Sequence, residues 1–149
     1  MNPNKALWEK GDFTRIAQSM RESGEAVVES LGVNPGLKVL DLGCGDGTTA
    51  LPAARRGADV LGVDIARNLV EAGNRRAQEH GLPNLRFQEG DACNLSELAA
   101  DTFDLVVSIF GAMFAPKPVR PGHIVNRSPG TSFTPRRCPG CKRVRRNSG

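Results

Sequence analysis

The sequence contains no tyrosine, one tryptophan, two histidines and four cysteines in 149 residues. Four unevenly spaced cysteines are too few for a disulfide-stapled scaffold, so reduced thiols are expected. The histidines, His80 and His123, form no Ser-His-Asp or Cys-His constellation with the rest of the sequence. The sequence therefore offers no candidate for a catalytic base, and we name none.

Long apolar runs are also missing. A helix that spans a bilayer needs roughly 20 apolar residues. The longest candidate, Leu105–Ala115, has about half that length and contains Ser108 and Gly111. The N-terminus begins Met-Asn-Pro-Asn-Lys and has no apolar signal-peptide region. We therefore expect a cytoplasmic protein with no membrane partner.

Acidic side chains are absent from the last 34 residues, although that stretch carries nine of the 20 basic residues and six of the ten prolines. No apolar periodicity is found there. Such a composition cannot bury enough apolar surface to offset its conformational entropy. We predict an incomplete globular domain at 1–118 and a basic, proline-rich, disordered tail at 119–149.

The predicted tail offers two weak functional signals. Cys138 and Cys141 resemble half of a zinc ribbon, but a structural zinc site needs four ligands and no second pair exists, so no metal is expected. The clustered arginines attract phosphates without sequence specificity. Phe133 is the only aromatic residue of the tail, so a stacking platform for bases is missing. We expect no specific nucleic-acid partner, and nucleic-acid binding through the tail is kept as an alternative.

Upstream of residue 116, short apolar segments alternate with amphipathic ones. Strands separated by helices of this length imply parallel pairing through right-handed crossovers. Continuous apolar strands are typical of a sheet covered on both faces. The expected fold is α/β, a Rossmann-like parallel sheet with helices on both faces. The predicted helices lie at 12–31, 48–56, 66–80 and 94–100, and the predicted strands at 37–42, 60–64, 85–87 and 103–110.

A glycine-rich segment, Val39–Thr48, joins the first predicted strand to a helix. Glycines there let the backbone pass close to a ligand and aim free helical N–H groups at it. Asp64 ends the second strand and Asp91 follows the third. The glycines alone fit a tight turn, and Asp64 alone fits a helix cap. Together they lie at the carboxyl ends of three strands, where open α/β sheets bind ligands, and they predict a nucleoside-binding crevice.

Four segments resemble the successive motifs of class I S-adenosylmethionine-dependent methyltransferases. They are Asp41–Gly47 (DLGCGDG), Gly62–Asp64 (GVD), Glu89–Ala92 (EGDA) and Phe103–Ser108 (FDLVVS). The resemblance covers roughly residues 7–118 and is strongest to the ubiquinone and menaquinone biosynthesis enzymes. It implies the strand order 3-2-1-4, the first half of a seven-stranded sheet. We hypothesise that a frameshift or truncation replaced the second half after about residue 118.

The resemblance implies S-adenosyl-L-methionine as cofactor and a role for each matching residue. Asp41 would hold the methionine amino group, and the glycines would line the methionine and ribose portions. Asp64 would bind the ribose hydroxyls, while Asp91 would accept from the adenine amino group. Trp8 and Phe13 fit either a lid or an N-terminal hydrophobic staple. The expected cofactor-binding residues are Asp41, Gly43, Cys44, Gly45, Gly47, Asp64, Ile65, Asp91, Ala92 and Ser108, the last through the 108–110 backbone.

A nicotinamide dinucleotide is the rival ligand, because such enzymes also pair a glycine loop with an acid at the end of strand two. Their usual spacing is G-x-G-x-x-G, whereas here the third glycine comes one residue early. Asp41 would repel a pyrophosphate and suits an ammonium group better. The pattern therefore favours the methyltransferase interpretation over a dehydrogenase.

The expected activity is methyl transfer to an unidentified small-molecule acceptor. The alternative is an inactive or binding-only remnant that retains the cofactor crevice. The apolar strand around 105–109 would leave an open sheet edge, and such an edge favours self-association.

Overall fold

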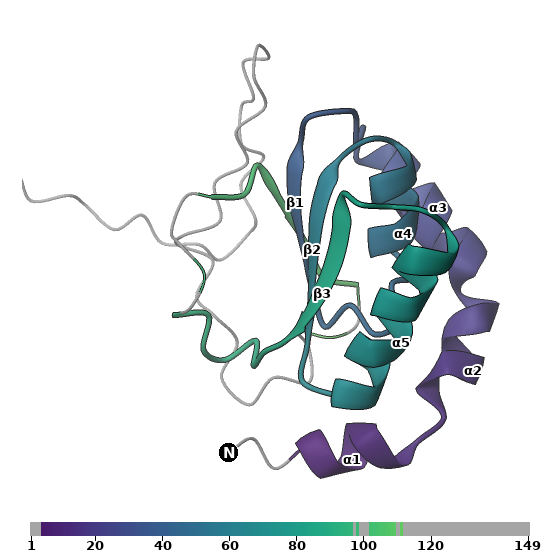
Figure 1. Ribbon diagram of the computed structural model, residues 1–149, viewed down its shortest axis with the longest axis vertical. Helices are drawn as coiled ribbons and strands as arrows, with labels where there is room; N and C mark the ends of the chain where they lie inside the picture. Colours follow the sequence, from purple (N-terminus) through teal and green to yellow (C-terminus); the bar gives the residue numbers. More distant parts are fainter. Residues whose placement is uncertain (1–3, 97, 99–101, 110, 112–149) are drawn as a thin grey trace, which may run out of the picture.

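The computed structural model describes residues 4–96, 98, 102–109 and 111 (Figure 1). The predicted tail, which includes Cys138 and Cys141, lies outside these residues. The hypothesis of a frameshift concerns that tail and is therefore not tested. In chain order the elements are α1 (Lys5–Lys10), α2 (Phe13–Ser19), α3 (Arg21–Ser30), β1 (Lys38–Leu42), α4 (Ala50–Arg55), β2 (Asp59–Asp64), α5 (Arg67–Glu79), β3 (Leu85–Glu89) and β4 (Leu105–Val107).

The described strands form one parallel sheet in the order β3-β2-β1-β4. In the register of the central pair, Lys38 lies opposite Asp59 and Leu42 opposite Val63. On the other side of β1, Val39 pairs with Leu105. The predicted parallel Rossmann-like sheet and its strand order are thus confirmed. In the described sheet β4 is an edge strand, and self-association through it stays a prediction.

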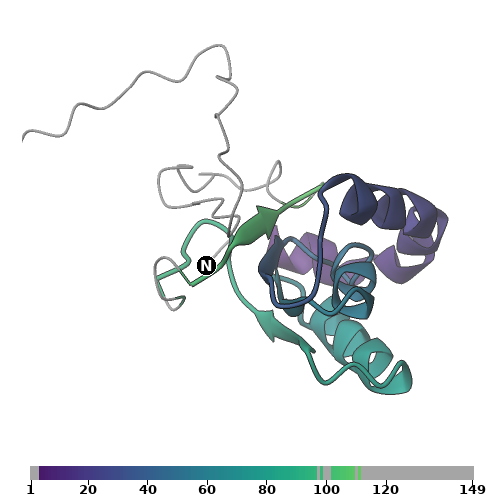
Figure 2. The same ribbon diagram turned by 90° about the horizontal axis from the view of Figure 1, so that it is seen from above.

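All helices of the described chain lie on one side of the sheet, as two perpendicular views show (Figures 1 and 2). The sheet grows outward from β1 to β2 to β3, and right-handed crossovers in one direction place their helices on the same face. The connection from β3 to β4 returns past β1 and so runs over the opposite face. There Leu95, Leu98 and Phe103 pack against apolar side chains of β1 and β2. Helices on both faces were expected, and the described residues of this connection, which are not helical, pack on the second face.

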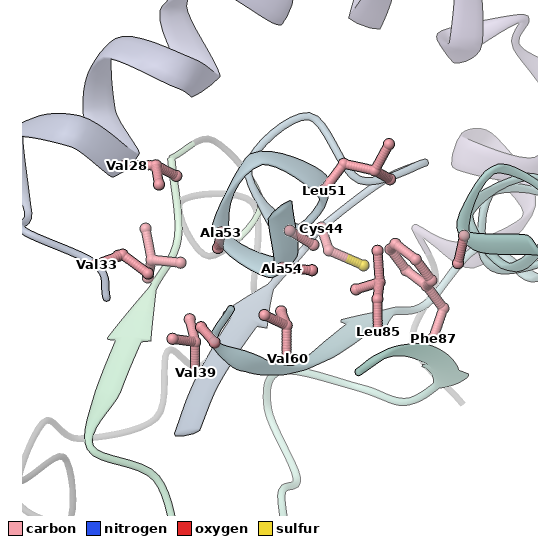
Figure 3. Close-up of a cluster of buried hydrophobic side chains, with 14 of the residues drawn as sticks. Val28, Val33, Val39, Cys44, Leu51, Ala53, Ala54, Val60, Leu85 and Phe87 are labelled. Carbon is pink, nitrogen blue, oxygen red and sulfur yellow. The ribbon is translucent and has the colours of Figure 1, made fainter. Parts of the chain in front are cut away.

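The main core lies between the sheet and the helices (Figure 3). Phe87 on β3 is 6% exposed, and its ring packs against three glycines. A Cβ atom added to Gly47, Gly62 or Gly73 would come within 2.6–2.8 Å of the ring carbons. The aromatic ring therefore fills the space that these glycines leave open beneath the loop after β1.

The N-terminal region differs from the prediction of one helix over 12–31. It contains three helices, and α2 and α3 meet at Met20, which has a non-helical φ of −103° and ψ of 2°. The two segments pack against different partners, since α2 contacts α5 whereas α3 contacts α4. A straight helix could not make both contacts. Consequently Ile16 is 56% exposed, although the periodicity predicted it on a buried face.

Two further predictions differ from the described residues, and residues 97, 99 and 100 of the second lie outside them. The strand expected at 103–110 is limited to β4. At 94–100 the described residues are not helical. The Asn94 side chain instead accepts a hydrogen bond from the Ser96 N–H (3.2 Å), a local turn that competes with helix formation. No helix of the described residues is long and apolar enough to cross a membrane.

Candidate functional site

The glycine loop runs from the end of β1 to the start of α4, at the carboxyl edge of the sheet. The N–H groups of Gly43 and Cys44 donate to the carbonyl oxygen of Val63 at 2.8 and 3.3 Å, so the loop is tied to the end of β2. Gly45 has a φ of +56°, in the left-handed region that favours glycine. A Cβ atom added there would meet no atom within 4 Å. The backbone therefore borders open space on this side.

Two hollows adjoin at this edge, and Trp8 and Gly43 line both of them. The larger has a volume of about 200 Å³ and lies between the glycine loop and the helices α2 and α3. The smaller, of about 40 Å³, lies over the ends of β2 and β3. Of the expected cofactor-binding residues, the larger hollow is lined by Asp41, Gly43, Cys44 and Gly45, and the smaller by Gly43, Asp64, Ile65, Asp91 and Ala92.

Asp41 is the most unusual group of the site. It lies on β1 and is only 2% exposed. Within the part of the chain that the structure describes, its Oδ2 atom has no hydrogen-bond partner. Burial raises the pKa of this carboxyl to about 7, the charge of Asp64 adds to the rise, and the Ala50 N–H opposes it. A buried acceptor without a partner costs free energy, so this wall of the larger hollow fits a cationic hydrogen-bond donor.

Asp64 connects the second strand to the glycine loop. Its Oδ2 accepts from the Gly45 N–H at 2.8 Å, and its Oδ1 accepts from the Ala66 N–H at 2.9 Å. Burial raises the pKa of this carboxyl, although the backbone N–H groups of Ala66, Gly45 and Ile65 oppose that shift. The bond to Ala66 closes a local turn just before α5, and α5 itself has no side-chain cap, so the expectation of a helix cap at Asp64 is wrong. Each carboxylate oxygen has a further lone pair, so these bonds do not exhaust its capacity as an acceptor.

Asp91 follows β3 and lines the smaller hollow beside Ala92. Its Oδ1 accepts from the Cys93 N–H at 2.9 Å, and its carbonyl oxygen accepts from the Asn94 N–H at 2.8 Å. These bonds fix the turn after β3, which presents the carboxyl group and the adjacent backbone to the hollow.

Two of the expected cofactor-binding residues line neither hollow. Gly47 has a φ of +93° and packs against Phe87 and Leu51, so it serves the core rather than the ligand space. The Ser108 hydroxyl donates to the carbonyl oxygen of Leu42 at 2.7 Å and joins β4 to the end of β1. The next residue, Ile109, lines the larger hollow instead. Residue 110 lies outside the described residues.

Cys44 is buried in the glycine loop and lines the larger hollow. Burial raises the pKa of its thiol well above the usual range, and the charges of Asp41 and Asp64 raise it further. The thiolate form is therefore disfavoured at neutral pH, and with it nucleophilic chemistry. Among the described residues, no group of three or more His, Cys, Asp or Glu side chains could hold a metal ion.

Helix α1 contributes a cover that the sequence only hinted at. The rings of Trp8 and Phe13 lie 4.8 Å apart, and Trp8 lines both hollows. The Lys5 ammonium pairs with the carboxylate of Glu89, at the end of β3. The Arg67 N–H also donates to Glu9 at 3.3 Å. Both contacts hold α1 across the carboxyl edge of the sheet, which favours the lid interpretation of Trp8 over a purely local staple.

A cluster of three charged residues beneath the loop was not anticipated. Arg21 on α3 and Arg76 on α5 both contact Asp46, between the second and third glycines of the loop. Nothing in the spacing of these residues signals the contact, because it depends on how α3 and α5 pack.

Comparisons with known proteins agree with this geometry. The sequence profile of the methyltransferase domain family matches residues 39–125. An uncharacterized protein of Mycobacterium tuberculosis is 40% identical over 114 residues, covering 76% of this chain and 41% of that protein. A ubiquinone biosynthesis O-methyltransferase of Acinetobacter baumannii is 34% identical over 116 residues, covering 68% of this chain and 49% of the enzyme.

Among solved structures, a TehB-like SAM-dependent methyltransferase from Corynebacterium glutamicum has a TM-score of 0.54 at 27% identity, covering 68% of this chain and 55% of that one. The chain spans 41% and 49% of the lengths of the two curated relatives named above. The profile match takes in β1, the glycine loop, Asp64 and Asp91, the elements that build the two hollows. The chain therefore belongs to the methyltransferase domain family, in its class I, S-adenosylmethionine-dependent form.

Proposed function

We propose that this chain binds S-adenosylmethionine across the two hollows and takes part in methyl transfer to a small-molecule acceptor. The observation that carries the proposal is the buried Asp41 carboxyl, whose Oδ2 atom has no partner within the described residues. The name of the solved relative from Corynebacterium glutamicum, a SAM-dependent methyltransferase, supports the choice of cofactor.

The residues of the site fit the parts of this cofactor. The ammonium group of the methionine portion would give Asp41 the missing donor, and its positive charge would lower the pKa of that carboxyl. Gly45 leaves the space that the methionine portion needs. Asp64 and Asp91 line the smaller hollow, where carboxylates suit the ribose hydroxyls and the adenine amino group. The glycines, Asp41 and Asp64 would thus hold the cofactor, which supplies a methyl group on a positively charged sulfur.

Displacement at that methyl group leaves a neutral thioether, so the protein mainly has to align the acceptor and exclude water. Trp8, which lines both hollows, would cover the junction between them. The described residues that line the larger hollow include no histidine, lysine or arginine. Their roles are therefore to bind, orient and exclude water.

The lining of the larger hollow also suggests the class of acceptor. Away from the glycine loop its wall is built by apolar side chains of α2, α3 and the neighbouring segments, including Phe13, Ile16, Met20 and Val27. The described lining residues include no cationic side chain that would balance an anionic acceptor. We therefore favour an uncharged, largely apolar small molecule. One of the relatives is named as a ubiquinone biosynthesis O-methyltransferase.

Calorimetric titration with S-adenosylhomocysteine tests the cofactor proposal. The wild-type chain should bind saturably, and Asp41→Asn should weaken binding about tenfold or more because it removes the charge that faces the ammonium group. Asp59→Asn is the matched control, since Asp59 is exposed at the other end of β2. Equal affinities of the two variants would refute the role of Asp41. Binding without methyl transfer to any apolar acceptor would support the binding-only alternative.

A further inference from the structure

The segment between the second and third glycines of the loop has an unusual anchor. Asp46 lies between Gly45 and Gly47, which have φ values of +56° and +93°. Glycines have the widest choice of backbone conformations in the unfolded chain, so ordering such a segment costs more entropy than elsewhere. Yet the Asp46 side chain is only 3% exposed. A buried carboxylate at the tip of a glycine loop requires strong partners.

Those partners come from two helices far apart in the sequence. Arg21 on α3 donates to both carboxylate oxygens of Asp46, from Nη1 at 3.0 Å and from Nη2 at 2.5 Å. Its Nη1 also donates to the Thr48 hydroxyl at 3.0 Å. Arg76 on α5 donates from Nη1 to the Asp46 carbonyl oxygen at 2.6 Å and lies 3.5 Å from Oδ2. The side chain and the backbone of one loop residue are thus held at the same time.

The charges make these contacts interdependent. The two arginine side chains are 25% and 23% exposed, so water screens them less than an exposed surface pair. They also repel each other, and Asp46 is the carboxylate that both contact. Removing one arginine would leave a buried carboxylate with fewer donors, whereas removing the Asp46 carboxylate would leave two mutually repelling cations without their shared partner.

The anchored segment lies directly beside the proposed cofactor site. The Gly45 N–H donates to Asp64 at 2.8 Å, and Gly45, Asp46 and Thr48 all line the larger hollow. On the other wall of this hollow, Met20, Gly24 and Val27 belong to or flank α3, the helix that carries Arg21. One guanidinium therefore connects both walls.

We propose that Arg21 and Arg76 are positioning residues, which act through Asp46 to hold the glycine loop in its ligand-binding conformation. The proposal rests on the proposed function, because the ligand in question is the cofactor. Neither arginine lines the hollows in the described structure, so both act on the ligand through the loop. Arg21 additionally fixes the wall formed by α3 relative to the loop.

A double-mutant cycle on S-adenosylhomocysteine affinity tests this inference. Arg21→Met and Asp46→Asn should each weaken binding about tenfold, and the double variant should be weakened by clearly less than the product of the two effects, because both substitutions remove the Arg21–Asp46 contact. Arg21→Lys keeps the positive charge but loses the bidentate contact with Asp46. Its affinity for S-adenosylhomocysteine should therefore lie between that of wild type and that of Arg21→Met. Independent, additive effects of the two substitutions would overturn the proposal.

Arg56→Met is the matched control, since Arg56 also pairs with a residue of α3, Glu29, at 4.0 Å but lies away from the loop. Its affinity for the probe should stay within about twofold of wild type. If Arg21→Met and Arg56→Met lose affinity equally, Arg21 has only a structural role. If Arg21→Met does not fold, Arg21→Lys with the same control decides the question.

Hydrogen exchange provides a readout that needs no ligand. Without Arg21 the Gly45 N–H should exchange at least about tenfold faster, while the amides of Leu40 and Leu61 in the central strands keep their protection. Unchanged exchange at Gly45 would refute the positioning role. A wild-type chain that fails to bind S-adenosylhomocysteine would refute the proposed function alone, and the exchange experiment would still decide whether Arg21 orders the loop.

Discussion

At the scale of single residues, the Asp41 carboxyl lowers the stability of the unliganded chain at neutral pH and above, and we propose that it binds the cofactor. Asp41 is buried, its Oδ2 atom has no hydrogen-bond partner within the described residues, and its pKa of about 7 lies well above the usual aspartate value of 3.8. The folded, unliganded chain therefore holds a proton that the unfolded chain releases at lower pH. The resulting contribution to stability is fully present below pH 4 and is lost as the pH rises through 7.

This linkage predicts an unusual effect of Asp41→Asn. Between pH 5 and pH 8 the free energy of unfolding of the wild-type chain should fall, by an amount on the order of 3 kcal/mol from Asp41. Asp64, whose pKa is also raised by burial, contributes in the same direction. In Asp41→Asn the free energy of unfolding should lose most of this dependence on pH. At pH 8 the variant should be more stable than wild type, although it should bind S-adenosylhomocysteine poorly. Urea unfolding at the two pH values measures the effect.

Asp59→Asn again serves as the control, because it makes the same substitution at an exposed position of β2. A variant at position 41 with the wild-type slope would show that the Asp41 carboxyl does not titrate as its burial requires. Loss of stability at pH 8 would show that Asp41 serves the fold rather than a ligand.

At the scale of elements, the packing of one ring links α5, β2 and the glycine loop. Gly73 lies within α5, where alanine would ordinarily stabilise the helix by up to about 1 kcal/mol. Here a Cβ atom would approach the Phe87 ring to 2.8 Å. Gly73→Ala should therefore destabilise the chain by about 1–3 kcal/mol through overpacking. Phe87→Leu in the same chain should recover part of that loss, and urea unfolding of the two single variants and the double variant checks the coupling.

The same elements show what the sequence could predict. Glycines and carboxylates at the ends of three apolar strands predicted that the glycine loop, Asp64 and Asp91 lie at one edge, since parallel strands bring their carboxyl ends together. The strand order and the role of Asp41 were implied by the resemblance to class I methyltransferases. Periodicity failed over 12–31, because the bend at Met20 arises from packing against two different helices. It also could not reveal that Gly47 faces Phe87, or that Arg21 reaches Asp46, 25 residues away. These contacts depend on tertiary geometry.

At the scale of the whole molecule, α1 lies across the carboxyl edge of the sheet, and we interpret it as a lid over the proposed cofactor site. The contacts that hold α1 there include the ion pair between Lys5 and Glu89 and the hydrogen bond from the Arg67 N–H to Glu9. Both members of the ion pair are partly exposed, and such pairs are worth little in free energy and are screened by salt. Opening of α1 should therefore be easy in the unliganded chain and should admit the cofactor.

This arrangement predicts that ligand release depends on Trp8 more than on the ion pair. Trp8→Ala removes lining from both hollows and should raise the dissociation rate of S-adenosylhomocysteine about tenfold. Glu89→Gln should raise it only about twofold, and added salt should remove the difference from wild type. Leu7→Ala is the control, because Leu7 lies on the same helix and is 62% exposed. Stopped-flow measurement of dissociation separates the cases. If Trp8→Ala and Leu7→Ala release the ligand at the same rate, α1 does not cover the site, and the two hollows exchange ligand without a lid.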